Sequence, residues 1–386
     1  MKRITTAQAQ KRKTLSTTLA STASGTSVSA TATQQLGYID LLKAGAAQFI
    51  VLHHLAFYGP MSVQVGTLAP DLIDWFYFHA RIAVQVFLVV GGFLAAKSLS
   101  AQGAPGIDYP LGAIVRRYLK LVPPFIVALL LAIAASAVAR LWMTDESASS
   151  LPDVLQFLAH ALLVHGIFGF ESISAGAWYV AIDFQLFVVV VVALWLSGRA
   201  AGGRALPWLM PLLVGAGVAA SLLYFNRDAR WDAWAPYFFG SYGLGMLAWW
   251  AGDPARRPVV VAPLVASMLV VTGLALALDF RLRIAIALLT ACSLIALGRA
   301  RLPLSPRSLA LIGQAGQISY AIFLVHFPVC LIVNAVFTRF VPAQPLWQAF
   351  GMLLAWAASV AAGMFFHESV ERPLNRLVEP LIRRGR

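Results

Sequence analysis

The chain has 386 residues, of which 60% are hydrophobic and only 12% are charged. Its mean hydropathy is +0.77. Polar residues are too few to cover a soluble globule of this length, so the composition excludes one and predicts a polytopic membrane protein. Cys292 and Cys330 both lie inside apolar runs. We interpret them as small buried residues, and we expect neither a disulfide nor a metal site.

The first 35 residues differ from the rest of the chain. Residues 1–35 are rich in Ser, Thr, Ala and Gln, and they contain basic residues but no acidic one. This composition is typical of a disordered basic tail, here expected in the cytoplasm. The segment lacks the apolar core of a signal peptide, so the first membrane helix is expected to remain in the mature protein.

Eleven apolar runs follow, and each is a candidate for a spanning helix, which needs roughly 20 apolar residues. One of them, at 154–170, is short and contains His160 and His165. If it does not cross the membrane, the basic residues of the later loops lie on the cytoplasmic side, as the positive-inside rule requires. The eleven runs are 41–57, 80–98, 121–139, 154–170, 178–197, 207–225, 234–251, 258–278, 284–298, 316–338 and 346–366.

The predicted fold is therefore all-α, a polytopic transmembrane bundle of about ten spanning helices. The run at 154–170 is expected to be a re-entrant or interfacial segment on the outer face. Both termini are expected in the cytoplasm. We divide the chain into the tail at 1–35, a membrane domain at 36–378 and a basic cytoplasmic C-terminal tail at 379–386.

The first apolar run contains a lysine and a histidine, Lys43 and His54. A charged or ionisable group at membrane depth is costly, which makes each a candidate functional residue. Lys43 would lie near the cytoplasmic surface and His54 about 16 Å further out along the helix. The alternative is structural, with Lys43 reaching the headgroups and His54 bonded to a carbonyl of a neighbouring helix.

Other ionisable residues are sorted by the same topology. Asp183 is predicted in the outer half of its helix, and His326 lies near the middle of another. A cluster of cations marks the cytoplasmic end of the third spanning helix. This cluster is either a topological anchor or a cradle for phosphate groups. Its members are Arg116, Arg117 and Lys120.

Six segments in order resemble the acyltransferase-3 family of integral membrane acyltransferases. GYIDLLKAGAAQFIVLHH is similar to the family's first helix, in which an Arg and a His are separated by ten residues, as Lys43 and His54 are here. VQVFLVVGGFLAAKSL and RRYLKLVPPF resemble its Phe-Phe-Val-Leu-Ser-Gly-Phe-Leu and Arg-Arg-x-x-Arg-Ile-x-Pro stretches. WYVAIDFQLF, ISYAIFLVHFPV and ESVERPL resemble its later signatures. The resemblance covers roughly residues 36–378.

The chain departs from the family pattern at several positions. Lys43 and Lys120 stand where the family has Arg, which keeps the charge but loses the planar fork that bonds two oxygens at once. Asp183 replaces Glu and so has a shorter stem. The remaining changes are Gly91 for Ser and Gln85 for Asp.

The resemblance implies transfer of an acyl group, commonly acetyl, from cytoplasmic acetyl-CoA or another acyl-CoA to a hydroxyl of an extracytoplasmic or lipid-linked glycan. His54 is the candidate general base for that hydroxyl. Asp183 is expected to orient the His54 imidazole. His326 is either a partner of the base or an acyl carrier.

The cations are assigned to the donor under the same resemblance. Lys43 is expected to hold the donor phosphates or the developing oxyanion. The Arg116, Arg117 and Lys120 cluster is expected to clamp the phosphates of CoA. No metal and no nucleic acid are expected, and the predicted location is a bacterial inner membrane. His53 is expected to face away from His54 and pack, and Glu371 with Arg372 to fix the cytoplasmic end of the last helix.

The same residues are consistent with two other functions. Buried Lys, His and Asp residues in a helical bundle are also typical of a proton-coupled transporter, in which Lys43, His54 and Asp183 would form a proton relay. No pair of interrupted helices in matching halves supports that class. The second alternative is a divergent family member that acylates a small metabolite other than a glycan.

Overall fold

A computed structural model describes residues 37–204, 206–299 and 305–384. Within these residues the chain is helical and forms no strand. The predicted basic tail at 1–35 lies outside the described residues. The first helix that the structure describes covers residues 37–57. The longer helices that follow are α4 (Ala83–Leu99), α5 (Pro110–Trp142), α7 (Ala177–Ala200), α8 (Leu209–Leu223), α9 (Ala235–Gly252), α10 (Pro258–Leu278), α11 (Leu282–Arg299), α12 (Pro306–Phe340) and α13 (Pro345–Phe366).

Prolines mark where many of these helices begin. Proline occupies one of the first two positions of α5, α10, α12 and α13, where its missing N–H costs no helical hydrogen bond. Short helices connect the long ones on one side of the bundle. They are α2 (Pro60–Gly66), α3 (Pro70–Phe78), η1 (Ala80–Ile82), α6 (Val154–Ala161), η2 (Phe225–Arg227) and η3 (Ala229–Trp231).

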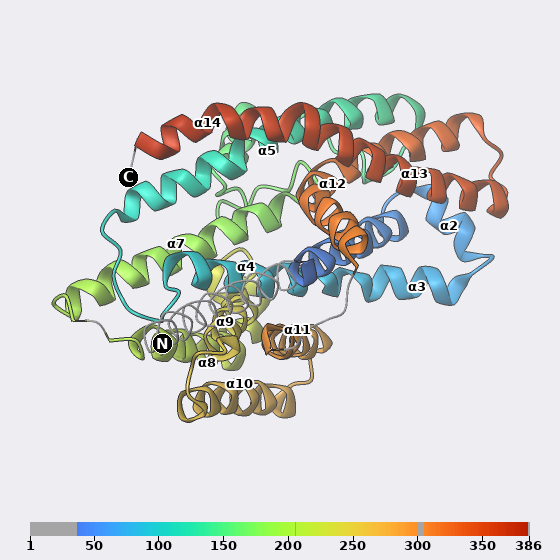
Figure 1. Cartoon of the computed structure of the whole chain (residues 1–386). Coiled ribbons are helices and arrows are strands. Elements are labelled where there is room, and N and C mark those ends of the chain that lie inside the picture. The colour runs from blue at the N-terminus through green and yellow to red at the C-terminus, as the bar shows by residue number, and fades with distance from the viewer. Residues whose placement is uncertain (1–36, 205, 300–304, 385–386) are drawn as a thin grey trace, which may run out of the picture.

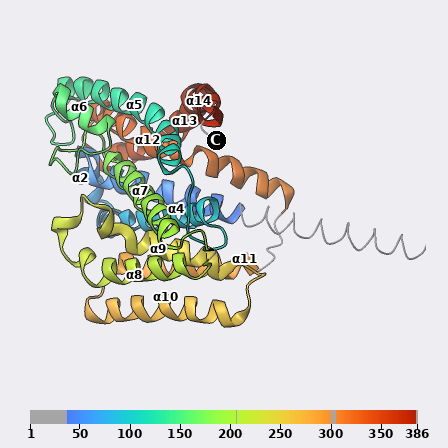
Figure 2. The same ribbon diagram turned by 90° about the vertical axis from the view of Figure 1, so that its left-hand side faces the viewer.

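The helices pack in layers (Figures 1 and 2). α10 forms an outer layer against α8, α9 and α11, and α9 packs in turn on α4. On the far side, α12 packs against both α5 and α13. The helix at 37–57 lies near the middle of the bundle (Figure 1). Its early residue Asp40 contacts α12 at Gly316, where a Cβ would lie 2.3 Å from the Asp40 Cβ.

The closest helix crossing joins α4 and α9 through two glycines. A Cβ at Gly92 would lie 1.8 Å from the Tyr242 carbonyl oxygen, and one at Gly245 would lie 1.9 Å from that of Val89. Small residues at such crossings let two backbones approach within van der Waals distance. Gln85, where the family has Asp, accepts a 2.6 Å hydrogen bond from Ser241 at the same interface. This crossing fixes α4 beside the site described below.

All ten ranges that were predicted to span contain a long helix, and the bundle is all-α and polytopic. In the described part of the chain, seven helices are long and apolar enough to cross a membrane. The count of ten spans therefore stays a prediction. The run at 154–170 contains only the eight-residue α6 followed by turns. Eight residues of helix extend about 12 Å, far short of the roughly 30 Å hydrocarbon core.

The last helix does not end at Glu371 and Arg372, so the role predicted for them is wrong. α13 continues through a π-helical turn, η4 (His367–Glu371), into α14 (Arg372–Arg384). Glu371 accepts a 2.8 Å hydrogen bond from His367, and Arg372 pairs with Glu368. The two residues stabilise a turn inside a continuous helix, and helix extends into the segment predicted as a C-terminal tail.

Candidate active site

Two buried histidines from distant parts of the chain meet in the bundle. His54 lies in the last turn of the 37–57 helix, and His326 lies in the middle of α12. The Nδ1 atom of His54 is 2.6 Å from the Nε2 atom of His326. Their rings are nearly parallel, with centroids 4.9 Å apart. His326 is thus a direct partner of His54.

The hydrogen bonds assign a tautomer to each ring. His326 Nδ1 lies 3.1 Å from the carbonyl oxygen of Ile322, which can only accept, so this nitrogen donates. In a neutral ring the other nitrogen, Nε2, is then an acceptor, and His54 must donate to it from Nδ1. His54 Nε2 is left with a lone pair and no proton. This arrangement is what a general base requires.

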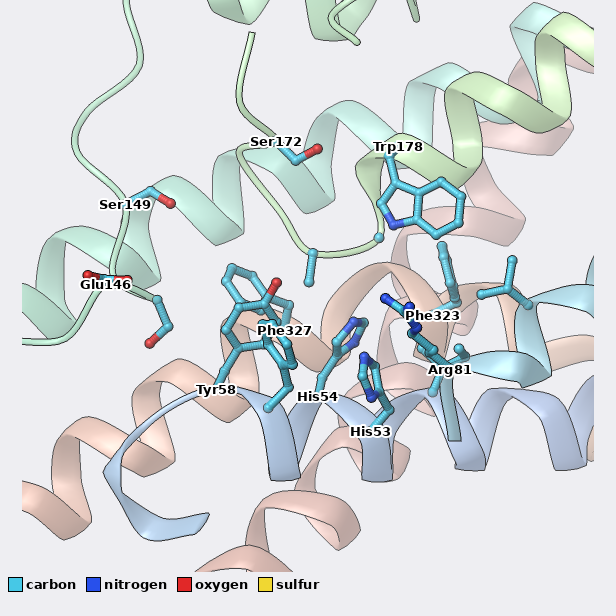
Figure 3. Close-up of a pocket in the computed structure, with 16 residues that line it drawn as sticks. His53, His54, Tyr58, Arg81, Glu146, Ser149, Ser172, Trp178, Phe323 and Phe327 are labelled. Carbon is cyan, nitrogen blue, oxygen red and sulfur yellow. The ribbon is translucent and has the colours of Figure 1, made fainter. Parts of the chain in front are cut away.

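Of the two histidines, His54 lines a cavity of about 440 Å³ (Figure 3). Its wall comes from the end of the 37–57 helix, η1, the start of α4, α12 and the loops on either side of α6. Under the predicted topology these segments lie toward the outside, except for α12, which contributes residues from the middle of the helix. The side chains that line it include Tyr58, Arg81, Glu146, Ser149, Ser172 and Trp178.

His53 lines the same cavity, so the prediction that it faces elsewhere is wrong. Its ring centroid lies 5.0 Å from that of His54. Its Nδ1 atom is 3.0 Å from the Phe76 carbonyl oxygen at the end of α3. This hydrogen bond ties the helix to the α3–α4 connection and leaves His53 Nε2 as an acceptor on the cavity side. His53 is therefore both a packing residue and a cavity residue.

Asp183 does not bond to His54 as predicted. Its carboxylate pairs instead with Arg117 across the α5–α7 interface, and the Arg117 guanidinium also lies over the ring of Phe187. Asp183 is buried, and breaking such a pair would leave a charge without its partner in a medium of low dielectric constant. The position of His326 explains the difference, because it already occupies the Nδ1 side of His54.

The Arg117–Asp183 pair is surrounded by tyrosines from three helices. Tyr179, Tyr242 and Tyr320 all lie within electrostatic range of the Asp183 carboxylate. Gly91 of α4 also lies against this pair: a Cβ there would be 3.2 Å from the Tyr242 ring and 3.4 Å from Asp183 Oδ1. The family's Ser at this position would therefore sit against the same carboxylate.

The remaining predicted cations gather toward the other end of the bundle. Lys43 pairs with Asp40 at 2.7 Å. Lys120 is exposed and lies within electrostatic range of Arg117, Glu371 and Lys43. Arg116 lies on the same turn of α5 as Arg117. Arg117 of the predicted donor set is paired with Asp183 of α7, and Lys120 lies within electrostatic range of both Arg117 and Lys43.

A second histidine pair supports the cavity wall. His160 and His165 are buried and stacked, with ring centroids 3.9 Å apart. His160 Nδ1 donates to the Gln156 carbonyl oxygen at 2.8 Å, and its Nε2 accepts from the backbone N–H of Ile173. Burial, together with the neighbouring His160, lowers the pKa of His165 to about 3. The pair holds the 172–176 loop, which forms part of the cavity.

A family model described as an acyltransferase domain matches residues 36–365, which is most of the chain. The chain belongs to the acyltransferase-3 family. The comparisons with curated proteins and with solved structures gave no match. The protein is accordingly a multi-pass membrane acyltransferase, and the His54–His326 pair and its cavity lie inside the matched region.

Four cavity residues of this acyltransferase-3 member were missed in the sequence. Tyr58, Arg81, Glu146 and Trp178 come from four different segments. Each lies at the outer end of an apolar run or just beyond it, and this is the signal that was available. Which of these flanking residues converge depends on helix packing, which the runs alone do not specify.

Proposed function

We propose that this acyltransferase moves an acetyl or other acyl group from cytoplasmic acyl-CoA to a hydroxyl of an extracytoplasmic or lipid-linked glycan. The observation that carries the proposal is the unprotonated His54 Nε2 beside a cavity of about 440 Å³. A cavity of this size is typical of small-ligand sites. The proposal includes a location in a bacterial inner membrane with both termini in the cytoplasm.

The chemistry follows from the hydrogen bonds. The acceptor hydroxyl donates its proton to His54 Nε2 while its oxygen attacks the thioester carbonyl carbon. The tetrahedral intermediate collapses, the carbon–sulfur bond breaks, and the proton on Nε2 passes to the departing thiolate of CoA. Atoms and charge balance, since the products are an ester and a thiol. His326 is a positioning residue in this scheme, because it holds the His54 tautomer and shares the charge of the protonated ring.

The separation of Lys43 and His54 along one helix favours one role for Lys43. Eleven residues of helix place the two about 16 Å apart, so Lys43 is too far from the reacting carbonyl to stabilise its oxyanion. In the proposal Lys43, Lys120 and Arg116 hold the phosphates of CoA, and the pantetheine arm extends toward His54. Arg117 is assigned to the pair with Asp183 instead.

The test is transfer of radiolabelled acetyl from acetyl-CoA to the glycan fraction of cells or membrane vesicles. His54→Ala should reduce transfer by about 10²–10⁴-fold, the contribution of a positioned base. His79→Ala, which changes an exposed histidine outside the cavity, is the matched control and should retain activity. Normal transfer by His54→Ala at equal protein level would contradict the proposal.

A further inference from the structure

The cavity contains a cation that neither the histidine pair nor the donor cluster uses. Arg81 belongs to η1 and lines the cavity together with His53 and His54. Figure 3 shows its guanidinium directed into the cavity, between the histidines and Trp178. In the part of the chain that the structure describes, this guanidinium makes no hydrogen bond and no ion pair.

The other charged group of the cavity lies away from Arg81. Glu146 comes from the loop after α5 and is drawn at the opposite end, close to Ser149 (Figure 3). The two residues form no salt bridge. The histidines beside Arg81 have the neutral tautomers described above. The end of the cavity that holds His54 therefore has an uncompensated positive charge, whereas hydroxyl and carboxylate groups occupy the other end.

A guanidinium that faces a concave pocket without a partner is suited to an anion. Arg81 is exposed, so its guanidinium is open to a ligand, and its planar fork matches the two oxygens of a carboxylate or phosphate. Trp178, at the same end, presents a ring with an apolar face and one N–H donor. Such a surface suits a sugar ring placed with its hydroxyls toward Ser149, Ser172 and Glu146.

We propose that Arg81 is the anion-binding residue of the acceptor pocket, and that the acceptor is an acidic sugar bearing a carboxylate or a phosphate. The inference rests on the proposed function, because it assigns the cavity to the acceptor. It makes Arg81 a determinant of acceptor specificity. An acceptor bound through its anionic group presents a neighbouring hydroxyl to His54.

The test measures binding to the purified full chain in detergent, at constant ionic strength, by saturation-transfer NMR. The probes are sodium glucuronate, glucose 6-phosphate and glucose. Wild type should bind at least one anionic probe about ten-fold or more tightly than glucose, as expected for a charge-assisted hydrogen bond. The tighter of the two anions identifies the source of the negative charge.

Arg81→Gln should abolish the preference for anions, and Arg81→Lys should retain part of it, which separates loss of charge from loss of fold. Arg230→Gln is the matched control, because Arg230 is an exposed arginine paired with Asp228 outside the cavity, and the preference should be unchanged. Equal affinity for all three probes, binding of none, or an undiminished preference in Arg81→Gln would overturn the inference.

His54→Ala distinguishes this inference from the proposed function. It should bind anionic probes with the wild-type preference while it loses acetyl transfer. Wild-type protein that binds anions but transfers no acetyl group would contradict the proposed function and leave the anion site intact. Wild-type protein that transfers acetyl groups but shows no preference for anions would contradict the anion site and leave the proposed function intact.

Discussion

At the scale of single residues, the central feature is a chain of hydrogen bonds that ends at a peptide carbonyl. It runs from His54 through His326 to the Ile322 carbonyl oxygen. In a serine hydrolase triad the equivalent orienting group is a carboxylate. Here the orienting group is a neutral ring, and the nearby carboxylate of Asp183 is committed to Arg117. His326 therefore controls which nitrogen of His54 bears the proton.

Replacing His326 should reveal this control. His326→Leu leaves the His54 Nδ1–H without an acceptor, so transfer should fall by at least about ten-fold, with the larger effect on kcat rather than on KM for acyl-CoA. His326→Gln offers an amide oxygen to the same N–H and should recover part of the activity. The measurement is the steady-state rate of acetyl transfer by purified protein.

A matching substitution outside the relay is Asn334→Ala, in the same helix and equally buried, which should change stability more than kcat. If His326→Leu turns over at the wild-type rate, the tautomer assignment is wrong and His54 is oriented by another group.

At the scale of elements, the α4–α9 crossing positions α4 against the site. Gly91 and Gly92 both lie at this crossing, but the space available for a Cβ differs greatly between them. A methyl group at Gly92 would overlap the backbone carbonyl of Tyr242 at 1.8 Å. One at Gly91 would lie 3.2 Å from a side-chain ring, which can shift by a few tenths of an ångström. Alanine substitutions at these two adjacent glycines can therefore be compared with each other for their effect on stability.

Gly92→Ala should destabilise the protein by about 1–3 kcal/mol or more, since two backbones must separate. Gly91→Ala should cost less. Thermal unfolding in detergent, followed by tryptophan fluorescence, measures both. Equal midpoints for the two variants would mean that the α4–α9 contact is looser than described.

Other elements show how far a single sequence predicts the structure. Apolar run length predicted the long helices well, because hydropathy acts locally. The two interactions that build the site are not local. His54 pairs with a residue 272 positions away, and Arg117 with one 66 positions away. The spacing of Lys43 and His54 set the depth of each residue but contained no information about its partner.

Because local patterns do not specify how helices pack, the predictions for His53 and Glu371 were wrong. Rotation about one helix axis places His53 about 100° from His54, yet the cavity is wide enough to include both faces. A π turn adds a residue to one helical turn, and no residue type in the 367–371 segment announces it.

At the scale of the whole molecule, the distribution of basic residues predicts which loops share a side of the membrane. Cysteines introduced at Arg204 and at Ser150, both exposed in loops, should be labelled from opposite sides of intact spheroplasts. The unaltered chain, with Cys292 and Cys330, provides the background. Labelling of both positions from the outside would contradict the ten-helix topology.

Stability of the whole molecule should also depend on pH through His165. Its pKa is about 3 in the folded protein, whereas an unperturbed histidine titrates near 6.5. As the pH falls from about 6.5 toward about 3, the unfolded chain binds a proton that the folded chain excludes, so stability decreases. Above about pH 6.5 both states are neutral at this residue, and the effect disappears.

His165→Phe keeps a flat ring against His160 but cannot titrate, so the unfolding midpoint should fall less between pH 7.5 and pH 5 than it does in wild type. His79→Gln, at an exposed histidine, should retain the wild-type dependence. A His165→Phe variant with an unchanged slope would show that other groups set the acid sensitivity.

The hydrogen-bond chain that ends at Ile322 has a consequence for the energetics of turnover. A backbone carbonyl cannot accept and pass on a proton, so the relay has no exit toward either side of the membrane. In the proposed reaction the proton taken from the acceptor therefore returns to the thiolate leaving group. Each cycle is electroneutral, draws nothing from an ion gradient, and is driven only by the difference in free energy between a thioester and an oxygen ester.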